Sequence, residues 1–217
     1  MTELVFLEPN KIDAVPFTTS RVIADMTGIE HRKIKVAIRK HQADVDSFGL
    51  SASYQAESTG GRPEEIIKLN EEQATFLMTL LKNTPVVVAF KKELVRQFYA
   101  MRRELIQRQV NRAALKPIRQ ELTDVIQASE GGDKWAYKKY TDLAYKSSVG
   151  RNAAQLRKER GAPKKAVAAD YMTAGEIAAV TKRQYQIAVL LEMGMEYQDV
   201  KAIVAGRPIP EEAGQGR

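Results

Sequence analysis

The chain has 217 residues and a formal net charge of +7, a length that suits one domain or two small ones. It has no cysteine and two histidines, which excludes disulfides, thiol catalysis and metal centres built on cysteine or several histidines. No apolar run approaches the ~18 residues that a membrane-spanning helix needs. Without such a run, and with no basic segment before an apolar block at the start, we expect a cytoplasmic protein. Motifs for phosphate-binding loops and nucleophile elbows are absent, so we expect that it is not an enzyme and needs no cofactor.

Residues 1–83 predict a small mixed domain. An apolar strand is expected over residues 4–7, followed by a helix over 21–26 and a second helix over 30–41. Alternating apolar and polar residues over 48–54, turn residues over 59–63 and an apolar segment over 66–69 predict a β-hairpin. Asn70 and Gln73 then form the start signal of a helix that reaches about residue 82.

The two short helices match a helix-turn-helix pattern. Ala24 provides a small residue where the helices cross, and Gly28 suits the turn. The packing positions hold Ile23, Ile29, Ile34 and Ala37. Since a hairpin follows, the sequence predicts a winged helix-turn-helix that binds duplex DNA. The alternative is an ordinary pair of helices with a solvated basic face.

The predicted DNA-binding residues fall into three groups. Those facing outward from the second helix suit base edges and phosphates: Glu30, His31, Arg32, Lys35 and Arg39. Hydroxyls before the first helix could donate to a phosphate: Thr18, Thr19 and Ser20. The hairpin tip could lie along the backbone or in the minor groove: Gly60, Gly61 and Arg62.

The remainder of the chain predicts helices. A long helix from Pro85 to about residue 115 is expected to be ended or kinked by Pro117, with another helical stretch over 118–128. This long helix either covers the winged-helix core or pairs with a second copy. After a Gly-Gly linker, helices are expected over 134–146, 151–160, 173–193 and 196–204. Thr173 and Glu176 form a capping box at the start of the third of these.

Basic residues are concentrated in the middle of the C-terminal half. Residues 131–171 hold 10 basic and 4 acidic side chains, whereas residues 1–83 hold 10 and 12. This excess predicts a second phosphate-facing patch, with simple solvation as the alternative: Arg157, Lys158, Arg160, Lys164 and Lys165.

These elements predict a mainly α fold with a small β-hairpin. We expect a winged helix-turn-helix domain over residues 1–83 and a helical connector over 84–129 that could dimerise. A small helical domain is expected over 133–206, and a disordered tail over 207–217.

Many of these residues also carry a family resemblance. The chain resembles the phage regulatory protein Rha family over residues 10 to about 108, through Phe17-Thr18-Thr19-Ser20, Ile23-Ala24, Thr27-Gly28, His31, Phe48, Gly61-Arg62, Leu69, the pattern from Gln73 to Asn83 and the pattern from Val88 to Arg102. Pro63 departs from the family where the return strand should begin. Residues 140–146 and 156–162 resemble C-terminal modules of phage antirepressor-like proteins.

The resemblance implies a phage or prophage transcriptional regulator. We expect it to act on DNA as a homo-oligomer and to be associated with the nucleoid of the bacterial host cell. The alternative is an antirepressor, in which the C-terminal domain binds and inactivates a phage or host repressor protein.

Overall fold

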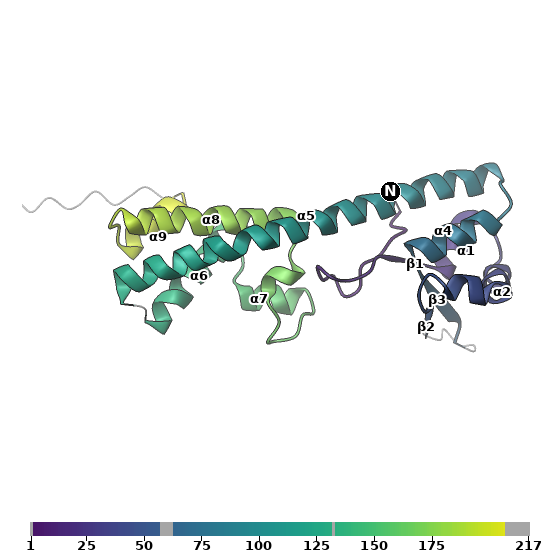
Figure 1. Ribbon diagram of the computed structural model, residues 1–217, viewed down its shortest axis with the longest axis horizontal. Helices are drawn as coiled ribbons and strands as arrows, with labels where there is room; N and C mark the ends of the chain where they lie inside the picture. Colours follow the sequence, from purple (N-terminus) through teal and green to yellow (C-terminus); the bar gives the residue numbers. More distant parts are fainter. Residues whose placement is uncertain (1, 57–62, 132, 207–217) are drawn as a thin grey trace, which may run out of the picture. The chain divides into compact units, whose positions relative to one another are not determined.

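The computed structural model describes residues 2–56, 63–131 and 133–206, and it is mainly helical with one small sheet (Figure 1). The chain forms two compact units. The first comprises Met1–Glu8 and Asp13–Arg103, and the second comprises Pro9–Ile12 and Glu104–Arg217. One long helix, α5 (Pro85–Glu130), contributes its beginning to the first unit and the rest to the second.

The sheet of the first unit has three antiparallel strands in the order β1-β3-β2. The hairpin strands β2 (Ala52–Gln55) and β3 (Glu65–Asn70) confirm the predicted ribbon. A strand that the sequence did not predict, β1 (Phe17–Thr19), pairs with the other edge of β3. Residues 4–7, predicted as a strand, make only an isolated bridge between Phe6 and Phe17, and Leu4 and Val5 pack into the core.

The first unit also has four short helices: α1 (Ser20–Thr27), α2 (His31–Lys40), α3 (Gln42–Asp46) and α4 (Glu71–Leu80). Of these, α1 and α4 pack against strands β1 and β3. Thr19 caps α1 by accepting a hydrogen bond from the Val22 N–H, and Gly28 ends it in the left-handed conformation with φ +71°. The predicted capping box of Asn70 and Gln73 opens α4. The helix α3 was not predicted from the sequence.

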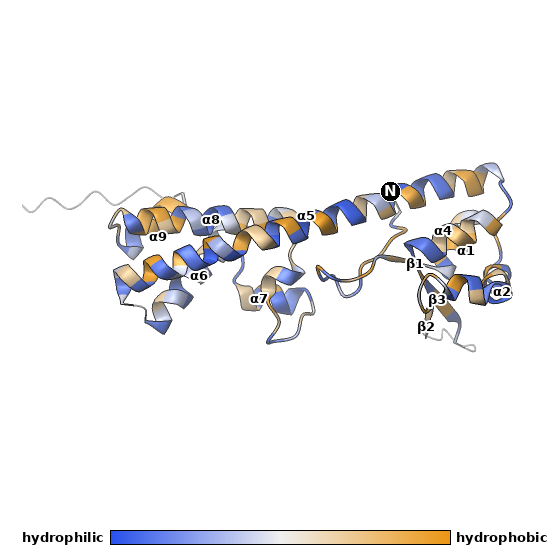
Figure 2. Ribbon diagram, in the orientation of Figure 1, coloured by the Kyte–Doolittle hydropathy of each residue, from blue (hydrophilic) through white to orange (hydrophobic). Residues whose placement is uncertain are grey.

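The alternative in which Pro117 ends the long helix is wrong, because α5 continues through it. Proline removes one backbone donor and costs stability inside a helix. Here Pro117 is exposed, and the buried side chains of Leu115, Leu122 and Ile126 hold the helix on both sides of it. Hydrophobic and hydrophilic residues alternate along α5 throughout (Figure 2).

The second unit contains α6 (Lys134–Val149), α7 (Ala153–Glu159), a short 3-10 helix (Ala168–Tyr171), α8 (Ala174–Glu192) and α9 (Tyr197–Val204). The capping box of Thr173 and Glu176 is present as predicted. Two apolar clusters form the core, one around Tyr140 and Ile187 and one around Leu156 and Met172. Among the described helices, none is both long and apolar enough to span a membrane.

Candidate nucleic-acid interface

Helix α2 has one buried side and one basic, exposed side. Ile34 and Ile38 are fully buried and pack in the core beside Ile23 and Ala24 of α1. Helical periodicity then turns the residues between them outward. Arg32 and Arg39 are exposed and Lys35 is half-buried, and Lys33 and Lys40 add exposed cations. The packing of the two isoleucines therefore fixes which side of α2 carries the charge.

Some of these cations are paired and others are not. Arg39 Nη2 lies 2.5 Å from Glu65 Oε2, and Lys33 Nζ lies 2.9 Å from Glu30 Oε1. Arg32 and Lys35 form no hydrogen bond or ion pair with another described residue. Exposed ion pairs are worth little, so Arg39 could exchange its partner for a phosphate at small cost. Arg32 and Lys35 would not have to give up any such contact.

The structure corrects the prediction for His31. This residue, the first of α2, is only 8% exposed. Its Nδ1–H donates to Glu64 Oε1 at 2.6 Å, and its Nε2 lies 2.8 Å from Ser20 Oγ. Because the ring nitrogens have these partners inside the protein, His31 cannot read a base edge from this position.

The three hydroxyl residues before α1 are also buried, and this corrects their predicted role. The Thr19 hydroxyl caps α1, and Ser20 Oγ accepts the Ile67 N–H at 3.0 Å. Thr18 Oγ1 is buried with no hydrogen-bond partner in the described structure. The segment predicted to donate hydroxyls to a phosphate is therefore strand β1 and the start of α1, and its hydroxyls face inward.

Ser20, His31 and Glu64 are connected in the same serine–histidine–carboxylate order as a hydrolytic triad, but this cluster cannot work as a catalytic site. A catalytic serine must reach a substrate, and Ser20 is 0% exposed. Its Oγ also holds the Ile67 N–H. The cluster instead joins α1, α2 and β3. The hydrogen bond from His31 lowers the pKa of Glu64, assisted by the charges of His31, Arg21 and Lys35 and opposed by partial burial.

The hairpin lies beside this cluster. The predicted tip residues Gly60, Gly61 and Arg62 are outside the described residues. At the base of the hairpin, the Ala56 N–H donates to the Glu64 carbonyl at 2.8 Å, and Arg21 Nη1 donates to Glu64 Oε2 at 3.1 Å. Glu64 therefore pairs with Arg21 of α1, and the neighbouring Glu65 pairs with Arg39 of α2.

The basic patch predicted in the second unit is only partly available. Lys158, Lys164 and Lys165 are exposed, and Arg157 is half-buried. Arg160 instead donates to Glu176 at 2.9 Å, across to the start of α8. Its side chain is mostly buried, so it belongs to the packing of this unit rather than to a phosphate-facing surface.

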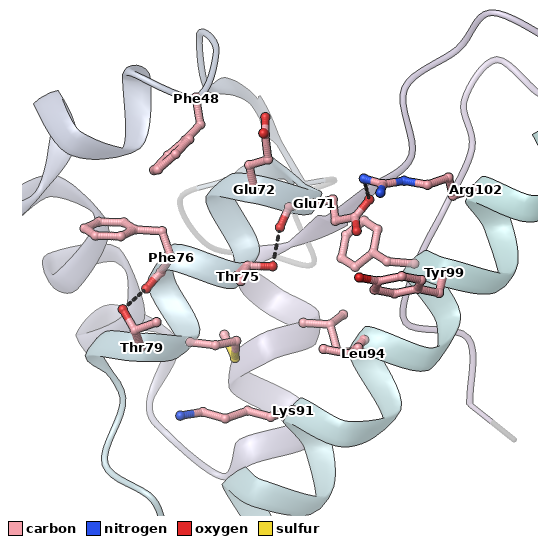
Figure 3. A pocket seen from close by; sticks show the side chains of 13 residues that line it. Phe48, Glu71, Glu72, Thr75, Phe76, Thr79, Lys91, Leu94, Tyr99 and Arg102 are labelled. Atoms are coloured by element: carbon pink, nitrogen blue, oxygen red, sulfur yellow. Dashed lines mark hydrogen bonds and ion pairs between the residues drawn. The ribbon is translucent and has the colours of Figure 1, made fainter.

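Sequence reasoning missed a pocket of about 720 Å³ in the first unit, between α4 and the beginning of α5. Leu94 and Tyr99 of α5 face α4 across it (Figure 3). Arg102 donates to Glu71 at 2.7 Å at one side of the opening. The sequence feature that could have predicted this pocket is the pair of apolar residues Val95 and Tyr99, which are exposed and lie beside the buried stripe of α5.

The described residues contain no group of three or more potential metal ligands. No curated protein matches the chain. Residues 18–103, which carry the sheet, α1 to α4 and the beginning of α5, match the model of the phage regulatory protein Rha family, and this part of the chain is therefore similar to regulators of that family.

Proposed function

We propose that the chain is a phage transcriptional regulator that binds duplex DNA through a winged helix-turn-helix. In this proposal α2 enters the major groove and the β2–β3 hairpin is the wing. The observation that carries it is the exposed side of α2, where Arg32 and Lys35 form no hydrogen bond or ion pair with another described residue. Arginine and lysine on such a helix can donate to guanine O6 and N7 or to phosphate oxygens.

This proposal assigns DNA contact to fewer residues than the sequence prediction did. Arg32, Lys35 and Arg39 remain candidates for DNA contact, whereas His31, Thr18, Thr19 and Ser20 position the helix from inside. Glu30 is exposed beside Lys33, so it stays a candidate at the start of α2. The match to a regulatory family supports the role, and the basic side of α2 supports its mechanism.

A paired substitution tests this proposal. The probe is a duplex that the wild-type chain selects from a random-sequence pool, and binding is measured by fluorescence anisotropy. The Arg32→Ala/Lys35→Ala variant should bind at least tenfold more weakly, since each good contact is worth ~1–3 kcal/mol.

The control removes the same charge elsewhere in the same unit. Lys82→Ala/Arg96→Ala changes two exposed cations away from α2, and we expect it to bind within about twofold of the wild type. Equal losses in the two variants would mean that α2 makes no directed contact. Failure of the wild type to enrich any duplex would also contradict the proposal.

A second candidate role is favoured by Trp135, which is 70% exposed at the start of α6. Tryptophan is enriched among residues that dominate protein interfaces, so an antirepressor-type contact could centre on it. In that case Trp135→Ala in the full chain should lose binding to the phage's repressor, measured by calorimetry, and keep its affinity for DNA. Unchanged repressor binding by this variant, or no binding by the wild type, would exclude the contact.

A further inference from the structure

The second unit contains a small pocket between α5, α6 and α8, with a volume of about 210 Å³. The three helices share an apolar cluster, which includes Leu122 and Ile126 of α5, Tyr140 of α6 and Ile187 of α8. Leu122 and Ile126 also line the pocket, together with the half-buried Tyr137. The pocket lies wholly within this unit.

A buried amide lines this pocket without a partner. Gln184 of α8 is only 2% exposed, and its Oε1 is enclosed with no hydrogen-bond partner in the described structure. Its Nε2 donates to no other described residue either. A half-turn of the amide exchanges its oxygen and nitrogen, so the group can present an acceptor or a donor to the pocket. Because an unpaired buried polar group destabilises a fold, a ligand atom that bonds this amide would satisfy it.

Two further unpaired groups line the pocket, one from each of the other helices. Arg119 of α5 is exposed and Thr141 of α6 is half-buried, and neither side chain forms a hydrogen bond or ion pair with another described residue. The other two hydroxyls donate elsewhere, Thr123 to the Arg119 carbonyl and Tyr137 to Gln127. The pocket therefore offers a guanidinium, a hydroxyl and an amide, each from a different helix.

The charge at this pocket is positive. Among the described residues that line it, Arg119 alone is charged. One helical turn from the lining residues, Lys116 on α5 and Lys134 on α6 add exposed cations. An anionic ligand group would therefore be attracted to this site, and a guanidinium can bind both oxygens of one carboxylate.

The acidic side chains of the same helices do not cancel this charge. Glu130, one turn after Ile126, accepts hydrogen bonds from Lys139 and Tyr140. On α8, no acidic residue lies within one turn of Gln184. The remaining carboxylates are displaced by about 100° or more around their helices from the residues that line the pocket: Glu121 and Asp124 on α5, and Asp142 on α6.

We propose that this pocket binds a small organic carboxylate with an apolar body. Arg119 and Thr141 bind the carboxylate, and the apolar body packs against Leu122 and Ile126. Gln184 donates to a ligand oxygen or accepts from a ligand hydroxyl. Since a cavity of ~150 Å³ holds benzene, about 210 Å³ suits a ligand of about eight to ten non-hydrogen atoms. An apolar lining with a few convergent polar groups is the usual form of a small-molecule site.

Benzoate has the size and chemistry that the pocket requires, and benzamide is its neutral counterpart of the same shape. Titration of the full chain with benzoate should shift the side-chain amide signal of Gln184 in NMR spectra, where Gln184→Leu identifies that signal. The Kd expected for so small a ligand is about 1 mM or tighter. Benzamide should bind at least tenfold more weakly, because it lacks the charge that Arg119 recognises.

Three variants assign the roles. Arg119→Gln, at an exposed residue, should weaken benzoate binding at least tenfold and leave benzamide binding unchanged. The matched control Lys158→Gln removes an exposed cation of α7 and should bind benzoate as the wild type does. Gln184→Leu should weaken binding of both compounds. Without ligand it should unfold at the same temperature as the wild type or higher, because it removes an unpaired buried amide.

The contrary outcomes are distinct. A wild-type chain that binds neither benzoate, phenylacetate nor 2-methylpropanoate at tens of millimolar overturns the proposal. Equal affinity for benzoate and benzamide, or equal losses in Arg119→Gln and Lys158→Gln, would also overturn it. A large destabilisation of ligand-free Gln184→Leu would assign the amide to the fold and overturn its role in the site. The pocket includes no residue of α2 or of the hairpin, so this proposal can fail without affecting DNA binding, and the reverse.

Discussion

Replacing Ile34 by alanine should lower the free energy of unfolding of the first unit by about 2–5 kcal/mol. Ile34 is fully buried and belongs to the core cluster that includes Ile23, Ile38 and Leu77. The substitution removes buried apolar area and leaves a cavity that the surrounding helices fill only partly. Urea denaturation followed by circular dichroism measures the loss.

The matched control is Val36→Ala, two residues away on the same helix. Val36 is exposed, and such substitutions usually change stability by less than ~0.5 kcal/mol. A loss of similar size in both variants would mean that α2 does not bury its Ile34 side. The outward orientation of Arg32 and Lys35, which is inferred from that burial, would then have no basis. This comparison therefore tests the packing on which the interface depends.

The second large effect is expected for His31→Leu, which should cost about 1–3 kcal/mol. Leucine fills part of the buried space but leaves Ser20 Oγ without its ring partner and removes the hydrogen bond to Glu64. Thermal unfolding at pH 7 gives the measurement. His41→Leu is the control, because His41 is more exposed, its ion pair is with the exposed Asp44, and leucine keeps an apolar side chain beside Phe76. It should change the stability little. A large loss for His41→Leu and none for His31→Leu would contradict the structure of the cluster.

The same cluster has a defined pH signature. The pKa of Glu64 is lowered in the folded chain, so the ionised carboxylate stabilises the fold above the ordinary glutamate pKa. This stabilisation is lost as the pH falls through the lowered pKa. The stability difference between the wild type and Glu64→Gln should therefore be larger at pH 7 than near pH 3. A difference that grows on acidification would have the wrong sign.

Local signals in the sequence predicted the helices well. Gly28, the Asn70–Gln73 capping box and the Thr173–Glu176 capping box each mark a boundary by a mechanism that operates within a few residues. The exception is Pro117, where buried residues on both sides of the proline maintain α5 despite the missing donor. Tertiary packing outweighs the local preference at that position.

Long-range pairing was harder to predict. Strand β1 has three residues, too few for a visible alternation, and it is held by pairing with β3 some 50 positions later. The burial of His31 has the same origin. Helical periodicity places it near the outward residues of α2, but Glu64 and Ser20 come from distant parts of the chain and draw it inside.

For the candidate interface, the sequence predicted the helix, but it did not show which polar residues are buried and hold that helix in place. Arg32 and Arg39 lie outward as the periodicity of α2 requires, because Ile34 and Ile38 take the core side. Thr18, Thr19 and Ser20 have side chains that can cap a helix or bind a phosphate equally well. Only their burial beside β3 separates the two roles.

The salt dependence of DNA binding tests the central claim, that cations on α2 meet the DNA. For the selected duplex, the logarithm of the binding constant is measured against the logarithm of salt concentration for the wild type and for Arg32→Ala/Lys35→Ala. This slope is negative, and each lost phosphate contact makes it shallower by ~0.9, so the loss of two contacts should make it shallower by about 2. Superimposable lines, with equal slope and equal affinity, would contradict the assignment of α2 as the DNA-binding helix.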